Sequence, residues 1–337
     1  MNSKSTHNFY MSRCIEVAKK GNGKTYPNPS VGCIIVNKNT IISEAFSGRY
    51  GKNHAEVNAI NKVKNKDLLK TSTLYVTLEP CSHFGKTPPC CNTIFKNKIP
   101  NVVVGTVDNS TKVSGKGIEF LKINNINVID GVLENQCKEL HKNFLHFNKN
   151  KRPYIILKWA QSKDKLFSPL NKIKNKPHWI SSKKSRQLVH KWRCEEHAIL
   201  VGYNTVISDN PKLNARDWKG NNPVRIVVDL ENKLNSKFEV FNNQTKTIKI
   251  TNNCIDKSLC TVNEICSFLF KKNIQSIIVE GGKKTLDKFI RTNLWDEARI
   301  FVNNENMETG IEAPELKGQI IQEKKIDKDK LKIIIPF

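Results

Sequence analysis

Segments that are typical of β-strands alternate with segments that are typical of α-helices along the whole chain, and this alternation restricts the possible folds most. In the first half, the runs "VGCIIVN", "TLYVTLE" and "NVVVGTV" predict strands, and "HAEVNAINKVK", "GIEFLKINN" and, at 134–147, "ENQCKELHKNFLHF" predict helices. Strands that alternate with helices favour an α/β fold, in which helices cover a mixed or mainly parallel sheet.

The alternation occurs twice, and a polar segment separates the two sets. The stretch "NKNKRP" at 148–153 is polar and ends in proline, so we place a domain boundary there, between residues 1–150 and residues 151–337. In the second set, "YIILKWAQS", "VRIVVD" and "SIIVEGG" predict strands, and "SSKKSRQLVHKWRCEEH" predicts a helix capped by Ser181 or Ser182. A length of 337 residues is enough for two ordinary domains.

Composition argues against several classes of protein. The chain has no run of about 18 apolar residues and its N-terminus lacks the apolar core of a signal peptide, so we expect a cytoplasmic protein without a membrane span. Its ten cysteines should be thiols or metal ligands rather than a disulfide framework. The formal charge of +25 is spread along the chain, so we expect no nucleic-acid partner; the positive field would instead favour a phosphorylated substrate.

Five residues of the first half match the signature of a zinc-dependent deaminase. That signature is H-x-E followed by P-C-x-x-C, and here His54, Glu56, Pro80, Cys81 and Cys90 match it with eight residues instead of two between the cysteines. The three metal ligands would converge from two helix starts and a strand end, at the carboxyl edge of the sheet. Three protein ligands leave the fourth zinc position to a water with a lowered pKa, and Glu56 would move its proton.

A structural zinc with four protein ligands is the main alternative for this site. Cys91 is the obvious fourth ligand, but on a helix its side chain points about 100° away from that of Cys90, which favours the open catalytic site. Two further hypotheses stay open. One is a zinc deaminase that acts on another pyrimidine or an RNA base, with an inactive or altered second domain. The other is a non-catalytic zinc module that binds nucleic acid.

The chain resembles the bifunctional riboflavin-biosynthesis deaminase/reductase family. "YPNPSVGCIIV", "HAEVNAI", "YVTLEPCSHFGKTPPC" and "VSGKGIEFL" carry the resemblance in the first half, and "LKWAQSKD", "DNPKLNAR", "PVRIVVD" and "IIVEGG" continue it over nearly the whole chain. The wide cysteine spacing in "CSHFGKTPPC" is its most specific part. The resemblance implies an N-terminal cytidine-deaminase-like α/β/α domain followed by a dihydrofolate-reductase-like α/β domain, in a homo-oligomer.

Two consecutive reactions follow from this resemblance. The first domain would use Zn²⁺ to deaminate 2,5-diamino-6-(5-phosphoribosylamino)pyrimidin-4(3H)-one hydrolytically to the 5-amino-uracil ribotide. The second would use NADPH to reduce the ribosyl group to a ribityl chain. The phosphoribosylated pyrimidine is therefore the expected partner of both domains.

The resemblance also implies site residues by motif. In the first domain, the implied substrate contacts are Asn28, His83, Lys86 and Asp108; the amide of Asn28 would hold the pyrimidine ring, and Lys86 suits an anion. In the second domain, the implied cofactor contacts are Ser162, Trp179, Thr205, Asp209, Gly281 and Gly282. The implied reductase substrate contacts are Lys158, Asp164, Arg193, Leu213, Arg216 and Glu280.

The second domain departs from familiar sequence patterns in two places. It contains no G-x-G-x-x-G fingerprint, and the turn Gly281–Gly282 before a predicted helix is the segment that would let backbone N–H groups approach phosphates. Where the family usually has Ser-x-Asp-Gly, Lys165 takes the place of the glycine. If φ is positive at that position, lysine costs about 1 kcal/mol or more.

Overall fold

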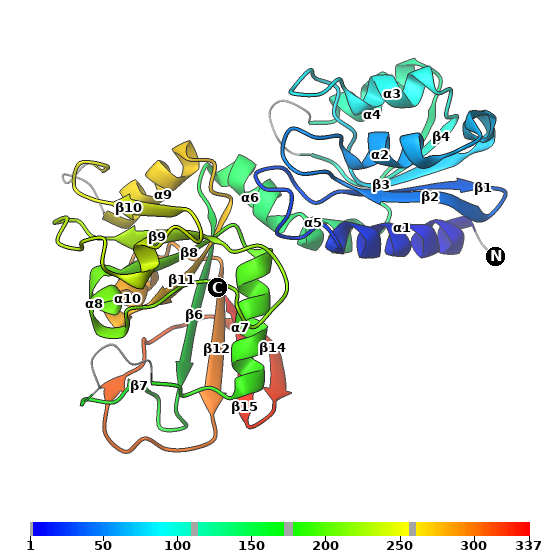
Figure 1. Cartoon of the computed structure of the whole chain (residues 1–337). Coiled ribbons are helices and arrows are strands. Elements are labelled where there is room, and N and C mark those ends of the chain that lie inside the picture. Colours follow the sequence, from blue (N-terminus) through cyan, green and yellow to red (C-terminus); the bar gives the residue numbers. More distant parts are fainter. Residues whose placement is uncertain (1–2, 109–113, 172–177, 256–260) are drawn as a thin grey trace. The chain divides into compact units, whose positions relative to one another are not determined.

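The computed structural model describes residues 3–108, 114–171, 178–255 and 261–337. The chain forms two compact units, Met1–Lys151 and Arg152–Phe337 (Figure 1). The division falls within the polar segment at 148–153. No helix among the described residues is long and apolar enough to cross a membrane.

The first unit contains a five-stranded sheet in the order β2-β1-β3-β4-β5. Its strands are β1 (Gly32–Asn37), β2 (Thr40–Phe46), β3 (Thr73–Leu78), β4 (Asn101–Thr106) and β5 (Asn127–Ile129). Strand β1 runs antiparallel to β2 and β3, whereas β3, β4 and β5 are parallel to one another. The sheet is therefore mixed.

Helices cover both faces of this sheet (Figure 1). One face packs against α2 (Ala55–Lys62), α3 (Cys90–Lys96) and α4 (Lys116–Ile123), and the other against α1 (Ser3–Lys19) and α5 (Glu134–Leu140). Strand β1 is buried along its whole length because its alternate side chains enter the two cores: Cys33 and Ile35 one, Ile34 and Val36 the other. A 3₁₀ helix, η1 (Lys66–Thr71), precedes β3.

The segment 134–147, which the sequence predicts as one helix, forms two. Helix α5 ends at Leu140 and α6 (Lys142–Asn150) begins after His141, whose backbone leaves the helical conformation at φ −101° and ψ 11°. The His141 ring is buried, and its Nε2 lies 3.0 Å from Thr77 Oγ1 in β3. We infer that attachment of this polar ring to the sheet breaks the helix.

The second unit contains an eight-stranded sheet in the order β10-β9-β8-β11-β6-β12-β15-β14. The first six strands in this order are parallel: β6 (Tyr154–Gln161), β8 (Ala198–Gly202), β9 (Val224–Val228), β10 (Thr247–Ile250), β11 (Ser276–Gly281) and β12 (Glu297–Asn303). Antiparallel β15 (Asp329–Ile335) and β14 (Gln319–Ile326) complete one end. Strands β7 (Leu166–Ser168) and β13 (Ile311–Glu312) form a separate pair.

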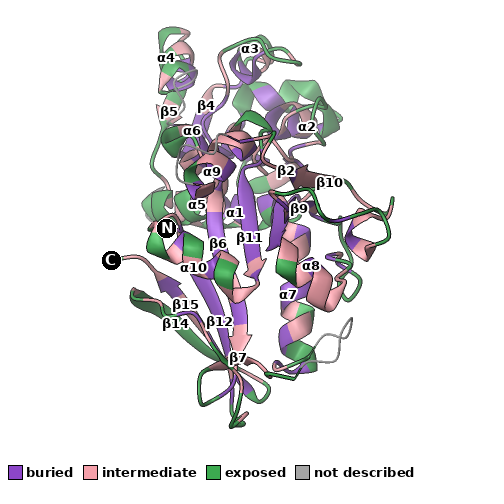
Figure 2. Cartoon of the chain, turned by 90° about the vertical axis from the view of Figure 1, so that its left-hand side faces the viewer, coloured by how far each residue is buried: buried purple, intermediate pink, exposed green. Residues whose placement is uncertain are grey.

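Helices also cover both faces of this larger sheet. Helices α9 (Thr261–Lys271) and α10 (Lys283–Arg291) pack on one face, and α7 (Lys183–Glu195) and α8 (Tyr203–Asp209) on the other. Ser182 caps α7, as predicted, by accepting a 3.2 Å hydrogen bond from the amide of Ser185. Figure 2 shows buried central strands beside the exposed edge strand β14. The sequence of β14, "QIIQEKKI", predicts no strand because it lacks alternation of apolar and polar residues. A short 3₁₀ helix, η2 (Glu239–Phe241), follows β9.

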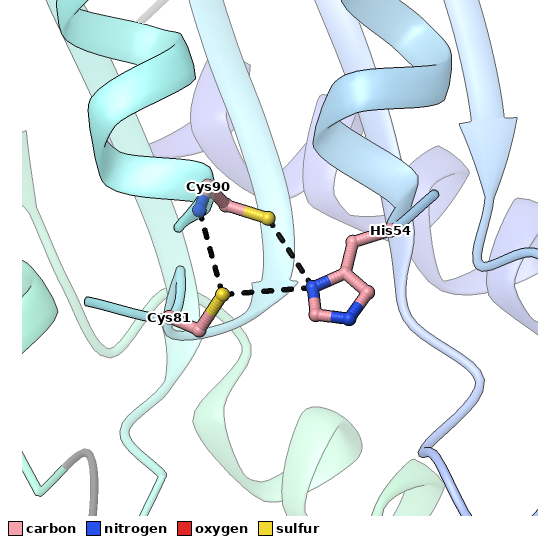
Figure 3. Close-up of side chains that lie close together, drawn as sticks. All are labelled: His54, Cys81 and Cys90. Carbon is pink, nitrogen blue, oxygen red and sulfur yellow. Dashed lines mark hydrogen bonds between the residues drawn. The ribbon is translucent and has the colours of Figure 1, made fainter. Parts of the chain in front are cut away.

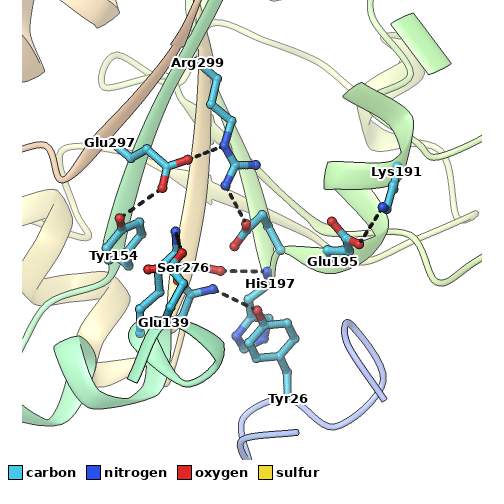
Figure 4. A network of polar contacts seen from close by, with 12 residues as sticks. Tyr26, Glu139, Tyr154, Lys191, Glu195, His197, Ser276, Glu297 and Arg299 are labelled. Atoms are coloured by element: carbon cyan, nitrogen blue, oxygen red, sulfur yellow. Dashed lines mark hydrogen bonds and ion pairs between the residues drawn. The ribbon is translucent and has the colours of Figure 1, made fainter. Parts of the chain in front are cut away.

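A buried network of charges lies at the amino ends of strands β6 and β12 (Figure 4). Arg299 donates to Glu297 at 2.5 Å and to Glu196 at 3.4 Å, and the Tyr154 hydroxyl donates to Glu297 at 3.1 Å. The Arg299 guanidinium also stacks 4.7 Å from the Trp192 ring. Pairing of this kind offsets the cost of burying charge, so we assign this edge of the sheet a structural role.

Candidate active sites

His54, Cys81 and Cys90 come together in the first unit (Figure 3). His54 immediately precedes α2, Cys81 follows the end of β3, and Cys90 is the first residue of α3. Nδ1 of His54 lies 3.6 Å from the Cys81 sulfur and 3.3 Å from the Cys90 sulfur. A tetrahedral zinc with ordinary bond lengths would hold nitrogen and sulfur ligands about 3.5 Å apart, so the donor set fits this ion.

The fourth position of this cluster is left open by the protein. Among the residues that the structure describes, the group able to hold a metal has three members, and Cys91 is not one of them. The Cys91 thiol instead points to the carbonyl oxygens of Pro80 and Gly117, at 3.3 and 3.5 Å. The arrangement is that of a catalytic site rather than a closed structural one.

Hydrogen bonding and burial shift the acidities of this cluster. Hydrogen bonds from Cys90 and His54 lower the pKa of the Cys81 thiol to about 4, and the Cys81 contact raises the pKa of His54 to about 8. Cys81 therefore favours the thiolate form that binds metal. Glu56 is buried beside this cluster and interacts electrostatically with His54 and Cys81; its burial raises the pKa of its carboxyl group to about 7.

Glu79, which was not singled out from the sequence, lies two residues before the ligand Cys81 and holds the described backbone after β4 and at the start of α4. Its buried carboxylate accepts hydrogen bonds of 2.8 to 3.3 Å from four backbone amides, those of Asp108, Gly115, Gly117 and Ile118. A Cβ at Gly117 would lie 2.0 Å from the Pro80 oxygen, so this position requires glycine. A carboxylate directly before the Pro-Cys pair and the paired glycines of "SGKG" were the available signals.

The predicted substrate residues of the first unit lie in loops around its sheet. Asn28 belongs to the turn before β1, where its backbone N–H donates to the backbone oxygen of Thr25 at 2.9 Å. His83 and Lys86 are exposed in the loop between the two cysteine ligands. Asp108 is buried after β4. Their contacts with a substrate stay predictions.

The second unit contains a cavity of about 1150 Å³. Residues at the carboxyl ends of β6, β8, β9 and β11 line it, together with the start of α10 and parts of α7 and α8. This is the edge at which parallel α/β sheets bind ligands. The cavity is lined by nine of the twelve residues predicted for the second domain: Lys158, Trp179, Thr205, Asp209, Arg193, Leu213, Arg216, Glu280 and Gly282.

A charged group lies in the wall of this cavity. Arg193 donates two hydrogen bonds to Glu280, at 3.0 and 2.7 Å, and a third to the Asn214 oxygen at 2.9 Å. Burial alone would raise the pKa of Glu280, but the charges of Arg193 and Lys158 lower it to about 2. Burial lowers the pKa of Lys158, and Glu280 partly opposes this effect. Arg193, Glu280 and Lys158 therefore place three charged groups in the lining of this cavity.

The two predicted arginines have different surroundings. Arg193 is engaged by Glu280 and Asn214, whereas Arg216 is exposed and donates to Asn214 Oδ1 at 3.3 Å. Arg216 is thus the guanidinium with more freedom to bind a phosphate. Leu213, which also lines the cavity, is buried and has a φ of +50°. This is a strained conformation of the kind found near functional sites.

Three predicted residues are not among those that line the cavity: Ser162, Asp164 and Gly281. Asp164 accepts hydrogen bonds from the Ser162 hydroxyl and from the amides of Met307 and Glu308, so it organises a turn. Gly281 has a φ of +114°, which side chains other than glycine rarely adopt, and it sets the turn before α10. We therefore expect these residues to affect the cavity through backbone conformation.

Lys165, which takes the place of the family's usual glycine, has a positive φ of +64°. Its amide donates to the Ser162 oxygen at 3.1 Å and its oxygen accepts from Ala313 at 2.8 Å. The lysine is exposed and is not among the residues that line the cavity. Lysine at this position thus strains the turn, but its side chain does not line the cavity.

Comparisons with known proteins agree with this division. The zinc-binding region of cytidine and deoxycytidylate deaminases matches residues 4–106, and the RibD C-terminal domain matches residues 153–304. The chain is 37% identical to the riboflavin biosynthesis protein RibD of Aquifex aeolicus over 330 residues, which cover 93% of this chain and 91% of that protein.

The chain belongs to the RibD family. RibD of Bacillus amyloliquefaciens is 35% identical over 314 residues, covering 87% of this chain and 83% of that protein. The crystal structure of the diaminohydroxyphosphoribosylaminopyrimidine deaminase/5-amino-6-(5-phosphoribosylamino)uracil reductase of Thermotoga maritima matches 99% of both chains with a TM-score of 0.90 and 34% identity. The predicted fold class, a cytidine-deaminase-like domain followed by an α/β reductase domain, is confirmed, and the second domain matches the RibD C-terminal domain.

Proposed function

We propose that this RibD chain catalyses two consecutive steps of riboflavin biosynthesis, hydrolytic deamination of the diaminopyrimidinone ribotide and NADPH-dependent reduction of its ribosyl group. The observation that carries the proposal is the presence, in one chain, of the His54, Cys81 and Cys90 cluster beside buried Glu56 and of a separate cavity with the Arg193–Glu280 pair. We assign deamination to residues 1–150 and reduction to residues 151–337.

Deamination replaces the 2-amino group of the ring by an oxygen from water and releases ammonia. Zinc, when bound by His54, Cys81 and Cys90, lowers the pKa of a water in the open fourth position. Glu56 would accept the proton of that water and deliver it to the departing amine, which is why a buried carboxyl beside the cluster matters. Asn28 would hold the pyrimidine ring, with His83, Lys86 and Asp108 as further substrate contacts.

Reduction adds a hydride and a proton to the opened ribosyl group. NADPH supplies the hydride when it is bound; its phosphates would lie at the Gly281–Gly282 turn and the start of α10. Ser162, Trp179, Thr205 and Asp209 would complete the cofactor contacts. Lys158 and Glu280 would face the ribosyl group, where a half-buried lysine with a lowered pKa is suited to give up a proton.

The remaining substrate contacts in this unit would bind the ribose phosphate. Arg216 has the freedom to form parallel hydrogen bonds to it. Arg193 would hold Glu280 in place, Leu213 would pack against the substrate, and Asp164 would support the turn of Ser162.

The comparisons support this function over the two alternatives. A deaminase for RNA bases would give the reductase unit no task, yet the relatives match both units. A basic zinc module would require neither Glu56 nor the cavity. We propose, further, a homo-oligomer and a cytoplasmic location; the free thiols of Cys81 and Cys90 at the proposed metal site are typical of a reducing compartment.

The catalytic role of Glu56 is tested by Glu56→Gln, which keeps the shape of the side chain and removes its acid–base function. We expect zinc content to stay at that of the wild type and deamination to fall about 100-fold or more. Reduction of the deaminated ribotide serves as the internal control. Deamination retained at the wild-type rate would refute the proton-transfer role.

A further inference from the structure

Two loops beside the zinc ligands are joined by one pair of side chains. Tyr50 lies in the loop that leads to His54, and Lys86 lies in the loop between Cys81 and Cys90. The Lys86 Nζ is 4.1 Å from the centre of the Tyr50 ring, within the range of a cation–π interaction.

The backbone of the first loop brings Tyr50 to this position. Gly48 donates to the Asn53 oxygen at 2.9 Å and Lys52 donates to the Arg49 oxygen at 2.8 Å, so the loop is closed on itself. Gly51 has a φ of +81°, and the position of a Cβ there would lie 3.7 Å from Cδ of Lys86. The stem of Lys86 therefore runs along the backbone of Gly51 toward the Tyr50 ring.

This contact leaves the ammonium group able to bind an anion. An ammonium has three N–H donors, and an aromatic ring covers one side of it only. The pair is open to solvent, since Tyr50 is 51% exposed and Lys86 is also exposed. Arg49 and Lys52, on either side of the Tyr50–Gly51 segment, add positive charge to the same loop.

We propose that Tyr50 is a positioning residue for deamination, which holds the Lys86 ammonium in place on the loop between Cys81 and Cys90, where it binds the phosphate of the ribotide. The inference rests on the proposed function. It adds to that function a residue that acts through Lys86, and it gives a reason why a phosphorylated substrate should be preferred.

The test compares two substrates with Tyr50→Ala and Tyr50→Phe. With the ribotide, Tyr50→Ala should raise KM for deamination about two- to five-fold at unchanged kcat, because an exposed cation–π contact contributes that much to positioning. Tyr50→Phe keeps the ring and should restore the wild-type KM. With the dephosphorylated riboside, KM should be the same for all three proteins.

Three outcomes would overturn the proposal. A KM for the ribotide that stays constant or falls in Tyr50→Ala would mean that the ring does not help Lys86 bind phosphate. Equal increases for ribotide and riboside would indicate general loosening of the loop. Loss of zinc would mean that Tyr50 supports the metal site. If the wild type itself did not deaminate the ribotide, the proposed function would fail first, so the two failures are distinguishable.

Discussion

Replacement of Lys165 by glycine should stabilise the second unit, although it removes a side chain. Lys165 has a φ of +64°, and the left-handed conformation costs a residue with a Cβ roughly 1–2 kcal/mol. Glycine avoids that cost but loses about 0.5–1 kcal/mol because its unfolded chain is more flexible. Both backbone hydrogen bonds of Lys165 can persist in the variant. We therefore expect a net gain of about 0.5–1 kcal/mol for Lys165→Gly.

Tryptophan fluorescence offers an assay specific to this unit. All five tryptophans, Trp159, Trp179, Trp192, Trp218 and Trp295, lie in Arg152–Phe337. Urea unfolding followed by fluorescence should give a higher midpoint for Lys165→Gly at an unchanged slope.

A matched control for Lys165→Gly comes from the same turn. Lys163 has no positive φ, so Lys163→Gly should lower the free energy of unfolding by about 0.5–1 kcal/mol, and the urea midpoint should fall with it. A lower midpoint for Lys165→Gly would refute the argument from backbone strain.

Three further predictions concern the metal, the substrate and pH. Cys81→Ser should abolish stoichiometric zinc binding, measured by metal analysis, and destabilise the first unit; an unaltered zinc content would show that the ligands are misassigned. Arg216→Ala should raise KM for the reductase substrate at least ten-fold and leave deamination intact; a parallel loss of both steps would contradict two separate sites. His190 and His197 have pKa values lowered to about 4 by burial, so the unfolded chain binds more protons below pH 6.5. The free energy of unfolding of the second unit should therefore keep the whole contribution of these histidines above pH 6.5 and lose about 2 kcal/mol per histidine at pH 5. Urea midpoints at the two pH values measure this loss, and equal midpoints at pH 5 and 7 would contradict it.

Much of the fold could be predicted because its signals are local. The strand β1 and the cap Ser182 follow from patterns within a few residues. The break at His141 could not be predicted, because its cause is a hydrogen bond to Thr77, which is distant in sequence. Edge strand β14 was missed since exposure on both faces removes the alternation on which the strand prediction depends.

The candidate sites divide in the same way. The zinc cluster could be predicted because its residue types and spacing are chemically restrictive, and the structure brings His54, Cys81 and Cys90 together. The contact between Arg193 and Glu280 could not be predicted, because these residues are distant in sequence and come together only through the strand order of the folded sheet. Glu79 was missed because its place before the Pro-Cys pair and the glycines of "SGKG" do not show by themselves that its carboxylate binds those backbone amides.

The central claim, two activities on one chain, is tested most directly by mass spectrometry of the pyrimidinone ribotide after incubation with the purified protein, with and without NADPH. We predict the deaminated ribotide without NADPH and a product heavier by two hydrogens with it. Unchanged substrate in both reactions, with zinc bound, would contradict the account. The deaminated ribotide alone in both would contradict the reductase half and leave the zinc site as the only active one.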